Sequence, residues 1–219
     1  MLKFLQQVFV LFICTLIIVS CSEKHDISQL PQSVTNGVYV LNEGDWGANN
    51  SEITYYNPQT GETATNIFFN ANGKLLGDTA NDMVIYGSKM YIAVSSSAVI
   101  FVTDLQGKVL SEMHVAGTSA YMSPRQFDCA NGKVYVTFME GYVGAIDTTD
   151  YSISTVEVGP MPEGIAYMDG KIYVANSDGY NPNYGNTVSV IDAKSLTVEK
   201  TLQVGTNPQN FCKSLNREL

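Results

Sequence analysis

The chain has 219 residues, of which 45% are hydrophobic and only 15% are charged, and this balance excludes an intrinsically disordered chain. Its 12 Lys and Arg residues are outnumbered by 21 Asp and Glu residues, which gives a formal net charge of −9. An acidic surface repels phosphate backbones, so DNA and RNA are not expected as partners. The 18 Gly and 13 Tyr residues indicate many short strands joined by tight turns.

Residues 1–20 have the pattern of a bacterial secretory signal. Lys3 precedes an apolar run over residues 8–19, which is too short to span a bilayer and suits the apolar region of a signal peptide. Residues 18–21, Ile-Val-Ser-Cys, resemble the lipobox of bacterial lipoproteins, which implies cleavage before Cys21 and a diacylglycerol on its sulfur. A plain signal peptide that contains a cysteine by chance, or a buried helix, is the alternative.

Residues 21–35 hold the lipidated cysteine and a polar segment without periodicity, which we interpret as a flexible tether. Ser22 does not look like a signal for retention in the inner membrane, so we expect the protein on the outer membrane, facing the periplasm or the cell surface. Two further thiols, Cys129 and Cys212, lie 83 positions apart. We interpret them as small apolar core residues, and a disulfide between them stays open.

Residues 36–219 contain four repeats, which we divide at 36–79, 80–123, 124–161 and 162–219. Each repeat has a turn followed by an apolar-Tyr-apolar triplet, centred on Tyr39, Tyr91, Tyr135 and Tyr173. The tyrosines are 52, 44 and 38 residues apart, and periods of this length built from strands are typical of β-propeller blades. We therefore predict an all-β fold of four-stranded blades, with the triplet in the second strand of each blade.

The other strands of each blade follow in a fixed order. In the three later repeats an innermost strand is expected to begin eleven residues before the tyrosine, at Ala80, Pro124 and Pro162. The third strand is expected to end at Asn57, Asp104, Asp147 and Asp192, where a side-chain oxygen can accept a bond from the backbone two residues on. The fourth strand is expected over residues 63–69, 108–115, 152–158 and 196–204.

The strand count leaves two architectures open. The first repeat lacks an innermost strand, and residues 208–215 can supply one more, which makes 16 strands or four blades of four. In one architecture the chain is a partial arc of a larger ring, and the final segment begins a fifth blade. In the other, that segment pairs with the first blade and closes a four-bladed ring. We expect the arc.

Two groups of segments resemble known propellers. Residues 173–176, Tyr-Val-Ala-Asn, with residues 188–192 and 204–208, look like the repeat of YncE-like (Tyr-Val-Thr-Asn) propellers. Residues 40–47 and 55–58 resemble the surface propeller lipoproteins of gut Gram-negative anaerobes. The resemblance implies a ring of seven or eight blades, of which this chain holds about four. Some members of that family bind cobalamin at the surface and pass it to an outer-membrane transporter, so a corrinoid and such a transporter are candidate partners.

Alternating strand direction places the loops between the second and third strands on the same face as the loops between blades. Two of the former are long, residues 42–51 and 177–186, and they carry Asn42, Glu43, Trp46, Tyr180 and Tyr184. The second position of each innermost strand, expected near the central channel, holds Asn81, Arg125, Glu163 and Gln209. Aromatic planes beside convergent polar groups suit a flat polar ligand such as a corrinoid or a glycan. The alternative is that these are ordinary turn residues and capped strand ends.

The sequence predicts no cofactor, metal site or catalytic site. Only two histidines are present, His25 and His114, and there is no Gly-x-Ser-x-Gly elbow or phosphate-binding loop. Side-chain oxygens at residues 176, 178, 181 and 183 alternate as in a calcium loop, but their spacing departs from that of an EF-hand. The sequence therefore favours a lipid-anchored, non-enzymatic propeller that binds a small molecule or a partner protein through its long-loop face. An interaction scaffold without a small-molecule ligand, and a propeller lyase or hydrolase, are the alternatives.

Overall fold

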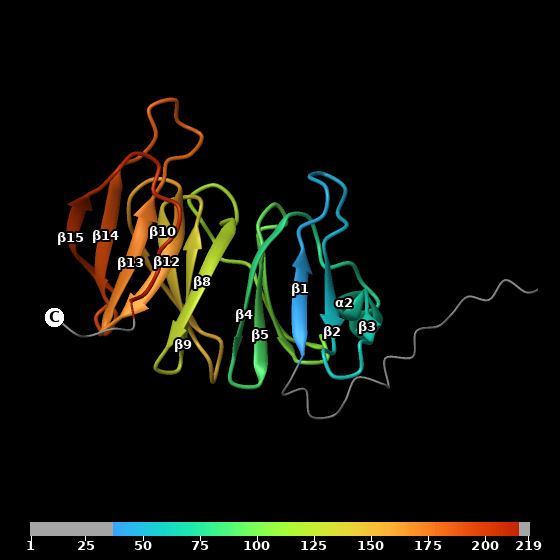
Figure 1. Cartoon of the computed structure of the whole chain (residues 1–219). Helices are drawn as coiled ribbons and strands as arrows, with labels where there is room; N and C mark the ends of the chain where they lie inside the picture. The colour runs from blue at the N-terminus through green and yellow to red at the C-terminus, as the bar shows by residue number, and fades with distance from the viewer. Residues whose placement is uncertain (1–36, 215–219) are drawn as a thin grey trace, which may run out of the picture.

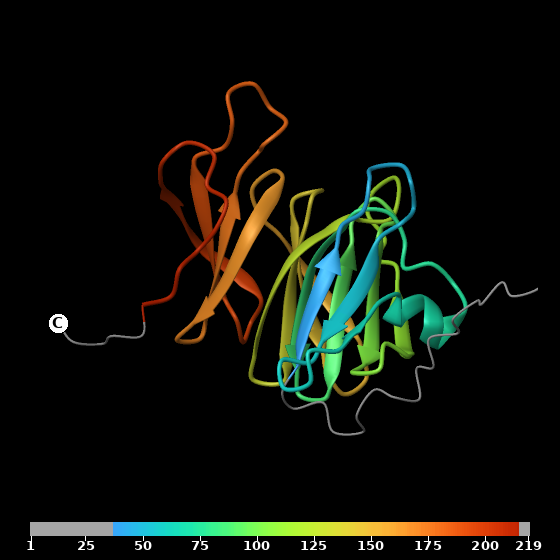
Figure 2. The same ribbon diagram turned by 45° about the vertical axis from the view of Figure 1, so that its right-hand side comes forward.

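The computed structural model describes residues 37–214, whose strands form four antiparallel sheets standing side by side in an open arc (Figure 1). The predicted signal, lipidated cysteine and tether lie outside the described residues. Figure 2 shows the first and last sheets at separate ends of the arc. The all-β propeller of about four blades is therefore confirmed, as an arc and not as a closed four-bladed ring. No helix within residues 37–214 is long and apolar enough to cross a bilayer.

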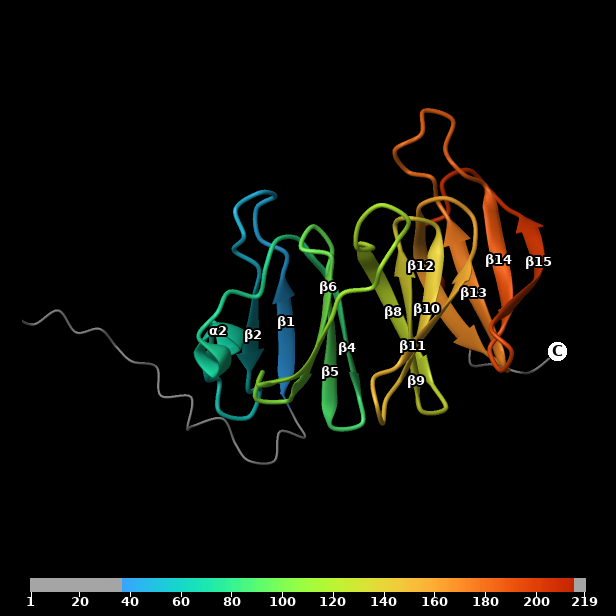
Figure 3. The same cartoon turned by 180° about the vertical axis from the view of Figure 1, so that it is seen from behind.

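The second, third and fourth sheets each contain four strands in sequence order. Figure 3 shows the arc of sheets from behind. The second sheet comprises β4 (Ala80–Tyr86), β5 (Lys89–Val94), β6 (Val99–Asp104) and β7 (Val109–Met113). The third comprises β8 (Pro124–Ala130), β9 (Lys133–Phe138), β10 (Tyr142–Asp147) and β11 (Ile153–Glu157). The fourth comprises β12 (Pro162–Met168), β13 (Lys171–Asn176), β14 (Thr187–Asp192) and β15 (Thr197–Gln203). The predicted starts of the three innermost strands are thus confirmed.

The first sheet has three strands, β1 (Val38–Asn42), β2 (Glu52–Tyr56) and β3 (Thr63–Ala64). The strand predicted over residues 63–69 is wrong beyond Ala64, because the chain there enters the helix α2 (Ile67–Asn72). Asn66 precedes this helix with a positive φ of 55°, a left-handed conformation that cannot continue the extended strand. Gly73 ends the helix with a positive φ of 68°. The helix buries Ile67 and Phe68 in the core between the first two sheets.

The strand predicted over residues 208–215 does not form in its described part, residues 208–214. This segment runs against β12, and an added Cβ on Gly164 would lie only 2.3 Å from the carbonyl oxygen of Gln209. It nevertheless joins no sheet of the described residues. Cys212, in the same segment, is exposed, so its interpretation as a core residue is wrong, while Cys129 is half-buried; both thiols are free.

Apolar junctions between neighbouring sheets hold the arc together, and the tyrosine triplets supply both sides of each junction. Tyr39, Tyr91 and Tyr135 each pack into the junction with the following sheet. The residues that flank the triplet tyrosine face the preceding sheet and are fully buried, namely Met90, Ile92, Val134, Val136, Ile172 and Val174. Each internal sheet therefore buries both of its faces, which a sheet in this position can do only between two neighbours.

The third strand of every blade ends in the same side-chain turn. Asn57, Asp104, Asp147 and Asp192 each accept a hydrogen bond on Oδ1 from the backbone N–H two residues on, at 2.9 to 3.1 Å. The turn predicted from these residue types is confirmed in all four blades. At Asp192 the carboxylate also bonds Lys171 Nζ at 2.8 Å.

The turn at Asp192 makes a prediction about acid stability. Its bonds to Lys171 and to the Ser195 backbone and hydroxyl hold the pKa of Asp192 well below the ordinary 3.8. A carboxyl whose pKa is lower in the folded state stabilises the fold above its unfolded pKa and loses that contribution as the pH falls through the folded pKa. We expect Asp192→Asn, which keeps a side-chain acceptor as Asn57 does, to flatten the fall in unfolding free energy between about pH 5 and 2. Urea denaturation across this range tests it, and an unchanged slope would contradict it.

Candidate functional site

Three of the predicted channel residues meet at one end of the innermost strands. Each innermost strand has a register shift near its start, between Ala80 and Asp82, Pro124 and Phe127, and Pro162 and Ile165. Asn81, Arg125 and Glu163 lie within these bulges. A bulge releases a residue from the alternation of the pleat and re-aims its side chain, so the same irregularity in three successive blades turns three polar side chains toward one another.

Arg125 joins the three blades through both sides of its guanidinium group. Its Nε and Nη2 donate to the two carboxylate oxygens of Glu163 at 3.0 and 2.9 Å, and its Nη1 donates to Asn81 Oδ1 at 2.9 Å. The side chains of Arg125 and Glu163 are only 18% and 16% exposed. A two-point pair with this geometry fixes the orientation of both groups. Both groups are therefore already engaged with each other rather than with solvent.

Gln209 does not join this network. Its Nε2 donates to Ser177 Oγ at 2.8 Å and also bonds Asn207 Oδ1. Ser177 Oγ in turn donates to Asn207 Oδ1 at 2.8 Å. Gln209 thus ties the final segment to the base of the 177–186 loop.

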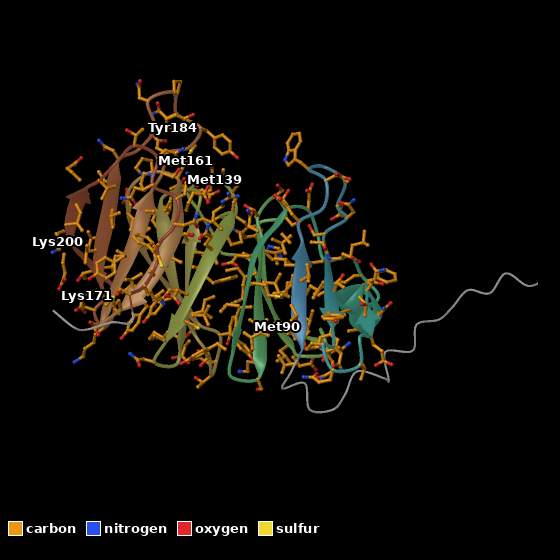
Figure 4. The ribbon with its side chains drawn as sticks, in the orientation of Figure 1. Met90, Met139, Met161, Lys171, Tyr184 and Lys200 are labelled. Atoms are coloured by element: carbon orange, nitrogen blue, oxygen red, sulfur yellow. The ribbon has the colours of Figure 1, made fainter. Side chains whose placement is uncertain are left out.

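The long loops project from the end of the arc at which β4, β8 and β12 begin (Figure 1), and the network lies at the starts of these strands. Trp46, Tyr180 and Tyr184 are 86%, 73% and 47% exposed, respectively. Figure 4 shows Tyr184 at this end and Lys171 toward the opposite end of the last sheet. We call this end of the arc the long-loop face; it comprises the loops 43–51, 95–98, 139–141 and 177–186 and the inter-sheet loops 73–79, 114–123, 158–161 and 204–207.

Hydrogen bonds fix the backbone of both long loops. In the first, Gly47 N–H donates to Asp78 Oδ2 at 2.8 Å and Ser51 N–H donates to the Gly77 carbonyl at 3.1 Å. In the second, Asn207 N–H donates to the Gly185 carbonyl at 2.7 Å. Tyr184 adopts a positive φ of 49°, which is unusual for an aromatic residue and marks a constrained backbone. The aromatic tips are therefore carried on anchored loops.

The structure gives Asn42 and Glu43 different roles. Asn42 Nδ2 donates to Glu52 Oε1 at 3.2 Å and to Thr54 Oγ1 at 3.1 Å, which keeps it within the first sheet. The carbonyl of Glu43 accepts from Ser51 Oγ, and its side chain adds charge to the loop. Asn176, one of the oxygens considered for calcium, uses its side chain to bond Gly159, Thr187 and Ser189. Within residues 37–214 no three His, Cys, Asp or Glu side chains are grouped as metal ligands.

The long-loop face is acidic, which reasoning from single residues missed. Its loops carry five carboxylates, namely Glu43, Asp45, Asp78, Glu140 and Asp178. Lys74 is the one lysine in these loops, and it is paired with Glu112. The turns and strand ends at the opposite face carry charges of both signs, namely Lys89, Lys108, Lys133, Lys171 and Lys194 together with Glu62, Asp104, Asp147, Asp150, Asp169 and Asp192. The signal in the sequence was the near absence of lysine from the loops of the long-loop face, and not a motif.

A family model described as a domain of unknown function, DUF5074, matches residues 36–216. The chain belongs to the DUF5074 family. No curated protein matches this DUF5074 chain. The finer resemblance to YncE-like, cobalamin-binding propellers stays a prediction.

Solved structures similar to this DUF5074 chain share its fold at low identity. Hydrazine synthase of Kuenenia stuttgartiensis is 15% identical, with a TM-score of 0.56 over 70% of this chain and 43% of that one. The computationally designed protein Ika8 is 12% identical, with a TM-score of 0.59 over 80% and 52%. The WD40 β-propeller domain of Doa1 is 13% identical, with a TM-score of 0.52 over 71% and 48%. The chain thus spans about half the length of these matched chains.

The Arg125 network predicts a specific pattern of stability changes. Arg125→Met leaves the Glu163 carboxylate without its partner, and removing one member of a largely buried pair costs about 3 kcal/mol. The double variant Arg125→Met/Glu163→Met removes both charges and is expected to recover most of that loss. Urea unfolding of the two single variants and the double variant measures the coupling. A loss below about 0.5 kcal/mol in Arg125→Met would show a solvated pair.

Proposed function

We propose that this chain is a non-enzymatic, lipid-anchored propeller of the cell envelope that binds a partner protein through its long-loop face. The β-propeller fold suggests a protein-interaction scaffold. The observation that carries the proposal is the exposure of Trp46, Tyr180 and Tyr184 on anchored loops of one face. Trp and Tyr supply large contact areas at a low entropic cost and dominate the binding energy of many interfaces.

The charge of the face indicates the chemistry of the partner. Glu43, Asp45 and Asp178 stand on the same two loops as the aromatic side chains, and none of them is in an ion pair with a described residue. Acidic groups around an aromatic patch attract a basic surface and accelerate association, an effect that salt weakens. We therefore infer a partner with a basic patch, such as an outer-membrane protein.

A flat small molecule such as a corrinoid is the second candidate. The exposed indole and phenol rings favour it, because they offer planes on which a macrocycle can stack. The engagement of Arg125 with Glu163 and Asn81 argues against it, since the polar groups expected to orient such a ligand already bond one another.

The orientation of the arc supports an anchor on the opposite side from the binding face. β1 begins at Val38, at the end of the first sheet away from the 43–51 loop (Figure 1). A lipid on Cys21 would therefore join the folded part of the chain at the end opposite the long-loop face.

A partner on the long-loop face can be captured in cells with a photo-crosslinking amino acid. We expect the cross-linker at Trp46 and at Tyr180 to give the same adduct, weakened several-fold when Glu43, Asp45 and Asp178 are changed to the corresponding amides. The matched control is Leu110, which is 47% exposed on β7, away from the loops. An equal adduct from Leu110, or no common adduct, would contradict the proposal.

The fluorescence of Trp46, the single tryptophan of the chain, distinguishes corrinoid binding from binding of a partner protein. Saturable quenching by cobalamin that is lost in Tyr180→Ala would favour the small molecule over the protein partner. A response no larger than that of free tryptophan would remove the corrinoid.

The anchor makes its own prediction. Cys21→Ser removes the sulfur that carries the lipid, so we expect the protein to move from the membrane fraction to the soluble envelope fraction. Cys212→Ser serves as the control because it changes an exposed thiol of the folded part. The mass of the mature unmodified chain is measured alongside, because a variant that keeps residues 1–20 stays on the membrane through that segment, and a mature Cys21 without a diacylglycerol would exclude this anchor.

A further inference from the structure

A small cavity opens at the outer edge of the first sheet, where helix α2 replaces the rest of the fourth strand (Figure 1). It is lined by the end of the 43–51 loop, the start of β2, the start of α2 and the 73–79 loop. Its lining lies within residues 50–76, and α2 is held against the second sheet by the bond from Asn72 Nδ2 to the Gly107 carbonyl. The cavity therefore belongs to the body of the arc and borders the long-loop face.

The cavity is apolar inside and at part of its rim. Phe68 and Leu76 belong to the buried core between the first two sheets. Phe69 and Leu75 also line the cavity, yet they are 47% and 52% exposed. Large apolar side chains that stand together at the surface beside a hollow are typical of a contact site. A side chain that enters this cavity would move its apolar part from water onto apolar surface.

The size of the cavity limits which side chain can enter. Its volume is about 110 Å³. A cavity of about 150 Å³ is needed to hold a benzene ring. The cavity is therefore too small to enclose an aromatic ring and suits an unbranched chain.

Glu52 supplies a carboxylate to the lining with one oxygen still available. Its Oε1 accepts from Asn42 Nδ2 and from Thr54 Oγ1, each at 3.2 Å. Its Oε2 accepts from no donor among the described residues. The carboxylate is thus held in place by one oxygen and can accept a hydrogen bond from a partner on the other.

The remaining polar groups of the rim also favour a cation. Asn66 precedes α2 but makes no side-chain cap hydrogen bond, so its amide oxygen is available at the rim. Asn50 Nδ2 lies 3.4 Å from Asp45 Oδ2, which brings a second negative charge close to the cavity. No lining residue is basic, and the neighbouring Lys74 is paired with Glu112.

We propose that this cavity holds a lysine side chain of the partner protein, an inference that rests on the proposed function. The aliphatic stem packs between Phe69 and Leu75, and the ammonium group donates to Glu52 Oε2 and to the Asn66 amide oxygen. Lysine suits such a place because its stem packs on apolar surface while its charge stays at the rim. Arginine suits it less well, because its planar group favours two-point pairing with a carboxylate and Glu52 has one oxygen left.

The cavity is tested first through the adduct of the cross-linker at Trp46. Leu75→Asp puts a charge in the apolar wall and is expected to reduce the adduct by at least about tenfold. Glu52→Gln keeps the shape but removes the charge and is expected to reduce it by about threefold. Glu62→Gln is the matched control, because Glu62 is an exposed carboxylate of the β2–β3 turn outside the cavity. Urea unfolding of each variant checks that the fold is kept.

The outcomes separate this inference from the proposed function. An adduct that persists undiminished in Leu75→Asp and Glu52→Gln would refute the lysine cavity and leave the partner protein in place. The absence of any adduct from Trp46 would refute the proposed function, and a measurement without the partner then decides the cavity alone.

That measurement uses the peptide acetyl-Gly-Lys-Gly-amide, titrated into the full chain in mild detergent while the methyl NMR signals of Leu75 and Leu76 are followed. We expect saturable shifts, with a dissociation constant that rises about threefold in Glu52→Gln and also when the lysine side chain of the peptide is acetylated. The absence of saturable shifts, or equal binding of the acetylated peptide, would overturn the proposal.

Discussion

The packing of one sheet against the next is the interaction on which the rest of this arc depends. β5 and β9 are buried on nearly every residue, so these central strands have no face left for water. A sheet of this kind needs an apolar neighbour on each side. The tyrosine triplet supplies apolar side chains to both neighbours, because its tyrosine faces the following sheet and the two flanking residues face the preceding sheet. The same pattern, repeated in all four sheets, makes the fold.

Polar contacts near the channel follow from this packing. Asp82 Oδ2 accepts from Phe127 N–H at 2.7 Å and Asp128 Oδ2 accepts from Tyr167 N–H at 2.6 Å, each across a junction. Burial raises the pKa of Asp82, which shows that this carboxylate serves the junction at a cost in desolvation. Together with the Arg125 pair, these contacts hold the sheets in register. The loops 43–51 and 177–186 lie outside these contacts and carry the exposed aromatic side chains that are available to a partner.

The sequence predicted the strands well where a local pattern repeats, and poorly where tertiary contacts decide. The innermost strands could be placed from the tyrosine register because every blade keeps the same length before its triplet. Helix α2 was not predicted because it depends on contacts with a distant part of the chain. The Oδ1 of Asn72 accepts from Val109 N–H of β7 at 3.0 Å, and its Nδ2 donates to the Gly107 carbonyl at 2.8 Å. The site was predictable in part for the same reason. Asn81, Arg125 and Glu163 lie at the same distance before their triplet tyrosines, and this shared register correctly placed them together. Gln209 is not part of a described sheet, so the register does not determine its position.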